Sequence, residues 1–161
     1  FPQWSKQRFA LASWRTLGTL VRCGSLRGLR ELSVKGSEDG DEGVALVAAA
    51  LRGGSLPFLT LLTLDDAGIR PHGASALAAA LTKLAVPSLM GLDLSNNQLT
   101  SIDFARVSVI SGFLTLRNNR LTHASLTQLT RVGGTINFSQ IADWRNLHSF
   151  ARKTGIAGRR N

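Results

Sequence analysis

The most regular hydrophobic pattern of the chain lies at residues 89–99, where apolar and polar residues alternate. Leucine and asparagine fill every fixed place of the pattern L-x-x-L-x-L-x-x-N-x-L in this stretch. Successive side chains of a strand point to opposite faces, so Leu92 and Leu94 are predicted to face a core while Asp93 and Ser95 face outward. A single short strand of this kind cannot bury its apolar side, and neighbouring copies are therefore expected.

Such copies exist at fixed spacings. The pattern returns 30 residues earlier at 59–69 and again at 29–37, and it returns 22 residues later at 114–121, with a weak last copy at 136–138. These units resemble leucine-rich repeats, of the ribonuclease-inhibitor type in the first half of the chain and shorter in the second. The resemblance implies an α/β fold, a short solenoid with a curved parallel sheet, helices outside and helical caps at both ends.

Apolar residues at helical spacing follow the first strands and predict the outer elements. They indicate one helix from Val44 to Arg52 and a second over 74–81. The acidic turn at 38–43 lacks the spacing of a calcium loop, and the positive end of the helix that follows explains its charge. The 22-residue units cannot hold long helices, so one-turn or irregular segments are expected there. Their returning apolar positions are Ile102, Val107, Ile110, Leu126, Leu129 and Val132.

The repeat asparagines separate two kinds of loop. Asn97 and Asn119 keep the consensus residue, and a buried amide at this place can pair with backbone groups of the turn. Ser37 and Ala67 replace it in the first two copies. We therefore expect the loops at these two residues to be held less firmly.

We expect a single domain, 1–161, with a cap at each end. Leucine and tryptophan spacing over residues 5–22 predicts a helix that ends at Gly24. A closing helix with Asp143 as its N-cap is predicted near the other end, followed by a basic tail from Ile156 to Asn161. The parts are 1–28, the N-terminal helical cap; 29–140, the repeats; and 141–161, the C-terminal helical cap and basic tail.

The charge of the chain is large and unevenly distributed. The net charge is +9, and it divides into +6 over residues 1–30, −5 over 31–66 and +8 over 67–161. Fifteen of the nineteen basic residues are arginine, which suits bidentate pairing with phosphate or carboxylate, although a bias in coding composition explains the same count. Opposite fields are therefore expected at different places along the molecule.

The sequence contains no recognisable catalytic or metal-binding arrangement. His72, His123 and His148 lie in different units without ligand spacing, and no nucleophile elbow or phosphate-binding glycine loop occurs. Cys23 is the one cysteine and is expected to be a small apolar packing residue. Asp65-Asp66, directly after a strand, is interpreted as the solvated rim of the sheet. The expectation is a protein that is not an enzyme and uses no cofactor and no metal.

The outward rows of the predicted sheet are the candidate binding surface, since repeat proteins bind through extended concave faces. Leu61 and Phe113 are large apolar residues in these rows, and Gly91 between them leaves a gap. Single surface hydrophobes are common, so this signal is weak by itself. The expected partner-binding residues are Leu61, Phe113, Asp65, Asp93 and Arg117 on the sheet and Arg8, Arg15, Arg145, Arg152, Arg159 and Arg160 at the basic ends.

Two functions fit these features. The first is a non-catalytic protein-binding or scaffold subunit of a larger assembly, such as a respiratory-chain complex. The second is a peripheral ribosomal subunit whose arginine-rich ends contact rRNA phosphates. Acidic protein surface, RNA phosphate and anionic lipid are the alternatives for the basic ends. Strong basicity, the lack of disulfides and a first residue other than methionine favour a mitochondrial protein, with a cytoplasmic one as the alternative; no apolar run is long enough to span a membrane.

Overall fold

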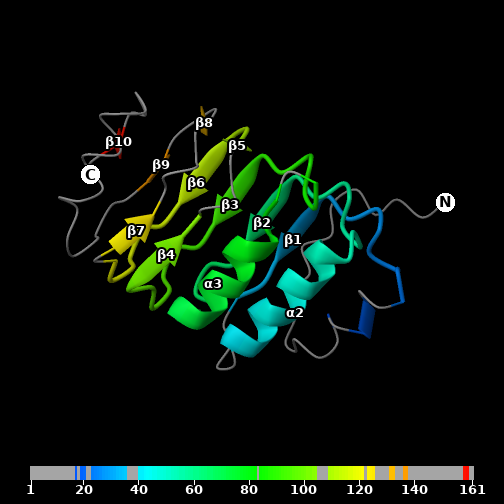
Figure 1. Ribbon diagram of the computed structural model, residues 1–161, viewed down its shortest axis with the longest axis horizontal. Helices are drawn as coiled ribbons and strands as arrows, with labels where there is room; N and C mark the ends of the chain where they lie inside the picture. The colour runs from blue at the N-terminus through cyan, green and yellow to red at the C-terminus, as the bar shows by residue number, and fades with distance from the viewer. Residues whose placement is uncertain are drawn as a thin grey trace.

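The computed structural model describes ten stretches of the chain (Figure 1). They are residues 17, 19–20, 23–35, 40–82, 84–104, 109–121, 123–125, 131–132, 136–137 and 158–159, with the main chain alone described at 109 and from 123 onward.

A parallel sheet of six strands forms the centre of the described fold. Its order is β1-β2-β3-β6-β9-β10, and every neighbouring pair is parallel. The first five strands are the ones that the sequence pattern predicts, which confirms one parallel sheet; β1, β2, β3 and β6 each begin one residue earlier than expected. The strands are β1 (Glu31–Ser33), β2 (Leu61–Thr63), β3 (Gly91–Asp93), β6 (Phe113–Thr115), β9 (Ile136–Asn137) and β10 (Gly158–Arg159).

The strand register repeats the spacing of the sequence. Leu32 aligns with Leu62, Leu62 with Leu92, and Leu92 with Leu114, so one residue type occupies the same level of four adjacent strands. These four leucines are buried, as are the residues two positions later, Val34, Leu64, Leu94 and Leu116. The two apolar rows form the inner face of the sheet, as the alternation predicts.

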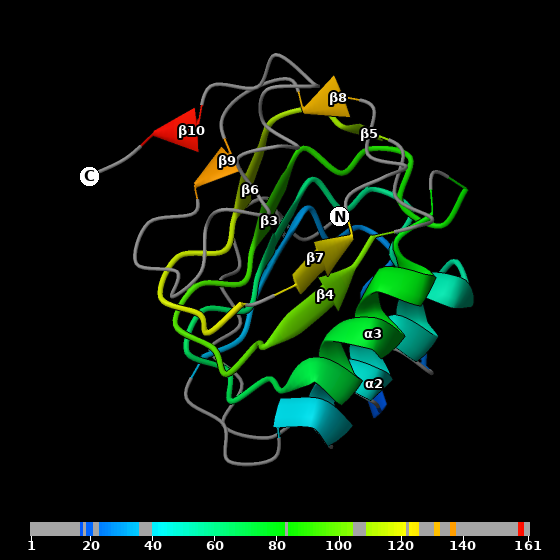
Figure 2. The same cartoon turned by 60° about the vertical axis from the view of Figure 1, so that its left-hand side comes forward.

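Two helices cover the inner face behind the first strands. Helix α2 (Gly40–Arg52) follows β1, and α3 (Pro71–Ala80) follows β2 (Figure 2). Both begin earlier than predicted. The acidic residues expected in a turn form the first turn of α2, where Asp41 and Glu42 lie at the positive end of the helix dipole. The expected apolar positions are buried: Val44, Val47, Ala48 and Leu51 in α2, and Ala74, Leu77, Ala78 and Leu81 in or directly after α3.

The first turns of the two helices are joined by a side chain. Arg70 is the N-cap of α3 and makes no capping bond with its own side chain. Its backbone N–H instead donates to Asp41 Oδ1 of α2 at 2.8 Å. Gly73 and Gly40 make this approach possible, because a Cβ on Gly73 would collide with the Asp41 carboxylate and one on Gly40 with the backbone carbonyls of Ala67 and Gly68. Glycine at these two places therefore serves close packing.

In the second half of the chain, the segments on the outer side of the sheet differ from those predicted. Short parallel strands stand where one-turn or irregular segments were expected: β4 (Ser101–Asp103) pairs with β7 (His123–Ser125), and β5 (Val109–Ile110) with β8 (Arg131–Val132). In Figure 1, α2, α3, β4 and β7 follow one another along one side of the sheet. Ile102 and Ile110 are buried as predicted, and Phe104, which the pattern did not single out, is fully buried beside them. Val107, Leu126 and Leu129 lie outside the described residues.

Part of the predicted N-terminal helix lies among the described residues. Leu17, Thr19 and Leu20 are helical, and Leu17 is buried in the core. Gly24 adopts a φ of +68°, and the N–H of Ser25 donates to Leu20 O at 3.2 Å, the bond of a glycine-terminated helix. The rest of the helix predicted over 5–22, and the closing helix near Asp143, lie outside the described residues.

One expectation about this region is wrong. Cys23 is exposed and therefore is not a packing residue of the core. It follows a helix end and lies in a surface turn, which the count of cysteines did not reveal. Within the predicted basic tail, Gly158 and Arg159 form a strand that pairs with Ile136 and Asn137 and extends the sheet. Backbone hydrogen bonds at a sheet edge accept almost any residue type, so composition alone did not predict β10.

No helix within the described stretches is both long and apolar enough to cross a membrane.

Candidate functional site

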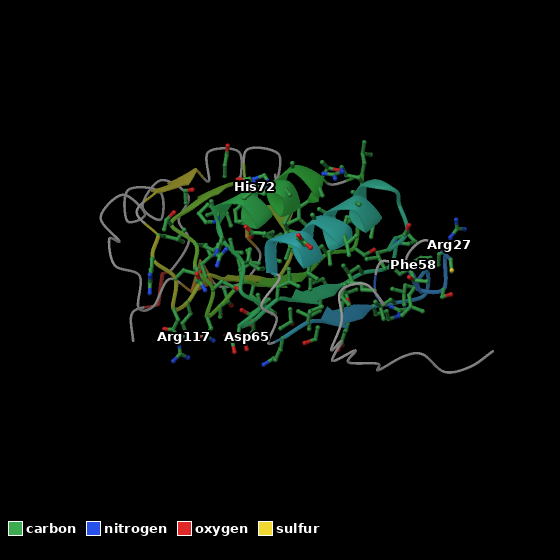
Figure 3. All side chains as sticks on the ribbon, turned by 90° about the horizontal axis from the view of Figure 1, so that it is seen from below. Arg27, Phe58, Asp65, His72 and Arg117 are labelled. Carbon is green, nitrogen blue, oxygen red and sulfur yellow. The ribbon has the colours of Figure 1, made fainter. Side chains whose placement is uncertain are left out.

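The face of the sheet opposite α2 and α3 carries the predicted outward rows, and we call it the open face. Its three rows are residues 31, 61, 91 and 113; residues 33, 63, 93 and 115; and residues 35, 65, 95 and 117. The register places each row in line across β1, β2, β3 and β6. Figure 3 shows Asp65 and Arg117 on the side of the sheet away from the helices. The rows therefore form one continuous surface.

Leu61 and Phe113 lie on the two sides of Gly91 on this face. Gly91 lies between them in β3, and a Cβ at Gly91 would come within 2.7 Å of Phe113 Cε1 and 2.8 Å of Leu61 Cδ1. The two side chains thus lean over the glycine from both sides and bury it. The gap expected at Gly91 is filled by its neighbours. Phe113 is still 36% exposed and Leu61 is half-buried, so the pair remains a raised apolar patch in contact with water.

A chain of polar contacts borders the open face where the strands end, and we call it the polar ladder. Lys35 Nζ donates to Asp65 Oδ2 at 2.7 Å, and Asn96 Nδ2 donates to Asp65 Oδ1 at 2.6 Å. Asn118 Nδ2 in turn donates to Asn96 Oδ1. The four residues come from four successive units, so the polar ladder joins the strand ends side by side.

The polar ladder shifts the acidity of Asp65. Partial burial raises the pKa of this carboxyl, but the hydrogen bonds from Lys35 and Asn96, together with the charge of Lys35, outweigh it and hold the pKa below its usual value of 3.8. Asp65 is therefore ionised at neutral pH and already has two partners.

The repeat asparagines behave as predicted. Asn97 is buried, and its Nδ2 lies 2.7 to 3.0 Å from the carbonyl oxygens of Leu64, Leu94 and Ser95. Asn119 is buried too, and its Nδ2 lies within 3.3 Å of the carbonyl oxygens of Leu94, Leu116 and Arg117. Each amide thus binds the turn of its own unit and the turn of the unit before it.

The loop at Ala67 is not left without such bonds. The Oδ1 of Asn97 accepts the N–H of Ala67 at 3.2 Å and that of Ile69 at 2.9 Å. The asparagine that the loop lacks is replaced by the one that follows 30 residues later. How firmly the loop is held relative to the later ones stays a prediction. The loop at Ser37 lies outside the described residues.

The other predicted partner-binding residues differ in whether their side chains are hydrogen-bonded within the chain, exposed or not described. Asp93 Oδ1 accepts both the N–H and the hydroxyl of Ser95, at 2.9 and 2.6 Å, and so is turned toward its own strand. The Arg117 side chain is exposed. Arg159 lies in β10, where only its backbone is described. Arg8, Arg15, Arg145, Arg152 and Arg160 lie outside the described residues.

Sequence reasoning missed one set of surface residues. Asp66, Asn96 and Asn118 have φ values of +53°, +56° and +55°, a left-handed conformation that Asp and Asn tolerate better than other non-glycine residues. They occupy the same place in three successive turns. The signal was present, because an Asp or Asn recurs there at the spacings of 30 and 22. Two of these residues carry the polar ladder.

Within the described part of the chain, no three His, Cys, Asp or Glu side chains gather closely enough to hold a metal ion. His72 is exposed in the first turn of α3 (Figure 3). His123 lies in β7 with its side chain not described, and His148 lies outside the described residues.

Comparison of the sequence with protein-family models and with curated proteins, and of the fold with solved structures, found no significant match.

Proposed function

We propose that this chain is a leucine-rich-repeat solenoid that serves as a non-catalytic, protein-binding subunit of a larger mitochondrial assembly, such as a respiratory-chain complex. The repeat interpretation is supported by the register, since strands 30 and 22 residues apart in sequence pair at equivalent positions. A scaffold role is supported by the extended open face, which is the kind of surface that repeat proteins use for binding. Fold resemblance alone names no partner.

The apolar pair Leu61–Phe113 is the observation that carries the proposal. Two large apolar side chains extend over Gly91 from its two sides, on a face whose other rows are largely polar. An apolar centre with a polar rim is the usual anatomy of a protein interface. Covering a fully exposed side chain of this size contributes ~1.5 to 3 kcal/mol, and these two half-buried groups contribute the smaller part of that range. The pair is the centre of the proposed contact.

The polar ladder and Arg117 form the rim of this contact. Each exposed ion pair there is worth at most ~1 kcal/mol, so these groups set orientation more than affinity. The basic ends have the same role in the proposal, with acidic protein surface, phosphate or anionic lipid as their counterpart.

Incorporation of the full chain into its assembly tests the proposal. The Leu61→Ser, Phe113→Ser double variant is expected to be lost from the large complex on native gels of mitochondrial fractions. Leu46→Ser is the matched control, because Leu46 is exposed on α2, away from the open face. Equal incorporation of the double variant and the control would contradict the proposal.

The net charge of +9 favours one second candidate, a ribosomal subunit held by rRNA phosphate. Removal of residues 156–161 would delete β10, so the charge is better removed by Arg159→Gln with Arg160→Gln. Loss of incorporation in this variant, with normal incorporation of the Leu61→Ser, Phe113→Ser variant, would favour the ribosomal candidate. A steep decrease of association with rising salt would accompany it.

A further inference from the structure

The loops that precede the strands form a second surface, distinct from the open face, which we call the strand-start edge. It comprises residues 23–30, 53–60 and 84–90, together with Arg52 at the end of α2. Backbone bonds join these loops side by side: the N–H of Thr60 donates to Arg30 O at 2.7 Å, and the N–H of Met90 donates to Thr60 O at 2.8 Å. The helices run back against the strands, so the end of α2 reaches the same edge (Figure 1).

Large apolar side chains are concentrated on the strand-start edge. Leu84 is 96% exposed, Phe58 56% and Met90 55%. These are three of the five exposed large hydrophobic side chains in the described part of the chain, and all three lie in loops rather than in a packed face. Figure 3 shows Phe58 and Arg27 toward the same end of the molecule. Single exposed hydrophobes need no explanation, but three on joined loops do.

The charge of the same edge has one sign. Arg27, Arg30 and Arg52 are exposed, and the sequence of these loops contains no Asp or Glu. The opposite edge, where the strands end, carries Asp65 and Asp66 beside its own arginines. Cationic groups and exposed apolar groups are therefore combined at the strand starts and nowhere else among the described loops.

We propose that the strand-start edge docks on an anionic lipid surface. Arginines near such a surface are attracted by its negative potential, while Phe, Leu and Met side chains enter the boundary between headgroups and acyl chains. A lipid boundary accepts apolar side chains from loops of irregular shape. An RNA partner would satisfy the arginines but would leave Leu84 and Phe58 in water.

Docking of this edge has a geometric consequence for the open face. Phe113 begins β6, and its N–H donates to Met90 O at 3.0 Å, so the open face starts where the strand-start edge ends. The strands then rise from the lipid surface. A protein partner on the open face would thus meet this chain beside a membrane.

Co-sedimentation of the full chain with vesicles tests the proposal without any partner protein. We expect partition onto phosphatidylcholine vesicles that contain phosphatidylserine, and much less onto phosphatidylcholine alone. Arg27→Gln with Arg30→Gln is expected to lower that partition by about thirtyfold. The control, Arg70→Gln with Arg120→Gln, removes the same net charge from exposed positions at the opposite edge and is expected to change it by less than about threefold.

The apolar contribution is tested by a second matched pair. Leu84→Ser is expected to lower partition by about tenfold, and Leu46→Ser, on the outer side of α2, to leave it unchanged. Leu84 is almost fully exposed, so the variant is expected to fold like the parent, and thermal unfolding checks this. Phe58→Ser tests the same apolar contribution to partition at a second, independent position.

Three results would overturn the docking proposal. The first is no partition of the chain onto either kind of vesicle. The second is an equal decrease of partition in the two double arginine variants. The third is partition of the Leu84→Ser and Phe58→Ser variants equal to that of the parent. Binding of single-stranded RNA that matches vesicle binding and is unaffected by Leu84→Ser would instead assign the edge to phosphate contact. Each result is independent of whether the open face binds a protein.

Discussion

Asn97 completes the turn that Ala67 cannot complete for itself. The N–H of Ala67 donates to the Oδ1 of Asn97, which lies 30 residues later in the sequence. The same oxygen accepts the N–H of Ile69, and the amide nitrogen of Asn97 binds the turn of its own unit. One buried side chain therefore links two successive units through backbone groups that have no access to water.

Loss of this side chain is expected to be costly. Asn97→Ala leaves buried N–H and C=O groups of two turns unpaired, and we expect the free energy of unfolding to fall by about 3 kcal/mol. Asn119→Ala removes the acceptor of the Leu99 N–H and should cost ~1 to 3 kcal/mol. Chemical denaturation measures both, with Gln98→Ala, at an exposed neighbour, as the control. An Asn97→Ala variant as stable as this control would mean that water replaces the amide.

Asp41 is expected to stabilise a helix to which it does not belong. Its carboxylate accepts the N–H of Arg70 at the start of α3, so Asp41→Ala should lower the free energy of unfolding by ~0.5 to 2 kcal/mol, as loss of an N-cap does. Glu42→Ala is the matched control, because it removes the same charge from an exposed position of the same helical turn. Asp41→Asn retains an acceptor and should fall between the two. If Asp41→Ala and Glu42→Ala lowered the free energy of unfolding equally, Asp41 would act through its charge alone and not through its hydrogen bond to Arg70.

The polar ladder should make a small part of the stability pH-dependent. The pKa of Asp65 is lower in the folded chain than its ordinary value, so the carboxylate stabilises the fold above about pH 4, the unfolded pKa being about 3.9. This contribution is lost as the pH falls through the lower, folded pKa. Lys35 is mostly exposed, which limits the effect to at most ~1 kcal/mol.

Unfolding of the parent and of Asp65→Asn over a range of pH measures this contribution. The difference in unfolding free energy should be largest near neutral pH and should vanish well below pH 4. Asp66→Asn, a change of the same charge at an exposed neighbour, should have a smaller effect at neutral pH. A difference between the parent and Asp65→Asn that persists in strong acid would show that packing, and not charge, is responsible.

Gly91→Ala should separate Leu61 from Phe113 with little effect on the fold. The new methyl group meets only the ends of two flexible side chains, so the free energy of unfolding should change by less than about 1 kcal/mol. The apolar pair would open, and incorporation into the assembly should decrease several-fold. Gly28→Ala, where nothing lies within 4 Å of the added atom, is the control. Normal incorporation of Gly91→Ala would show that the partner does not depend on the closed pair.

The sequence predicted the sheet because its signal is periodic. Leucines at 62, 92 and 114 recur with the register of the strands, and the buried positions of α2 and α3 recur with them. The outward rows follow from the same alternation, so Leu61 and Phe113 were correctly placed on one face. Their close approach to Gly91 was not predicted, because it depends on the length of two side chains and on the missing side chain of Gly91.

Local features without a period were predicted less well. Asp41 reaches Arg70 through a contact between two helices, and no pattern within either helix marks it. Strands β4 and β7 form because equivalent segments of two successive units pair with each other, where one-turn or irregular segments were expected. The pairing of Gly158 with Ile136 joins segments that share no sequence pattern at all.

The change from helices to strands on the outer side has a mechanical consequence. Packed helices need about 8 to 10 Å between their axes, whereas neighbouring strands are about 4.8 Å apart. Where α2 and α3 stand behind β1 and β2, the helix side of the stack needs more width than the sheet side, so the sheet is expected to curve there. Where β4 and β7 stand behind β3 and β6, back and front have equal widths, and the stack can run straight. The sheet is thus expected to curve more at β1 and β2 than at β3 and β6.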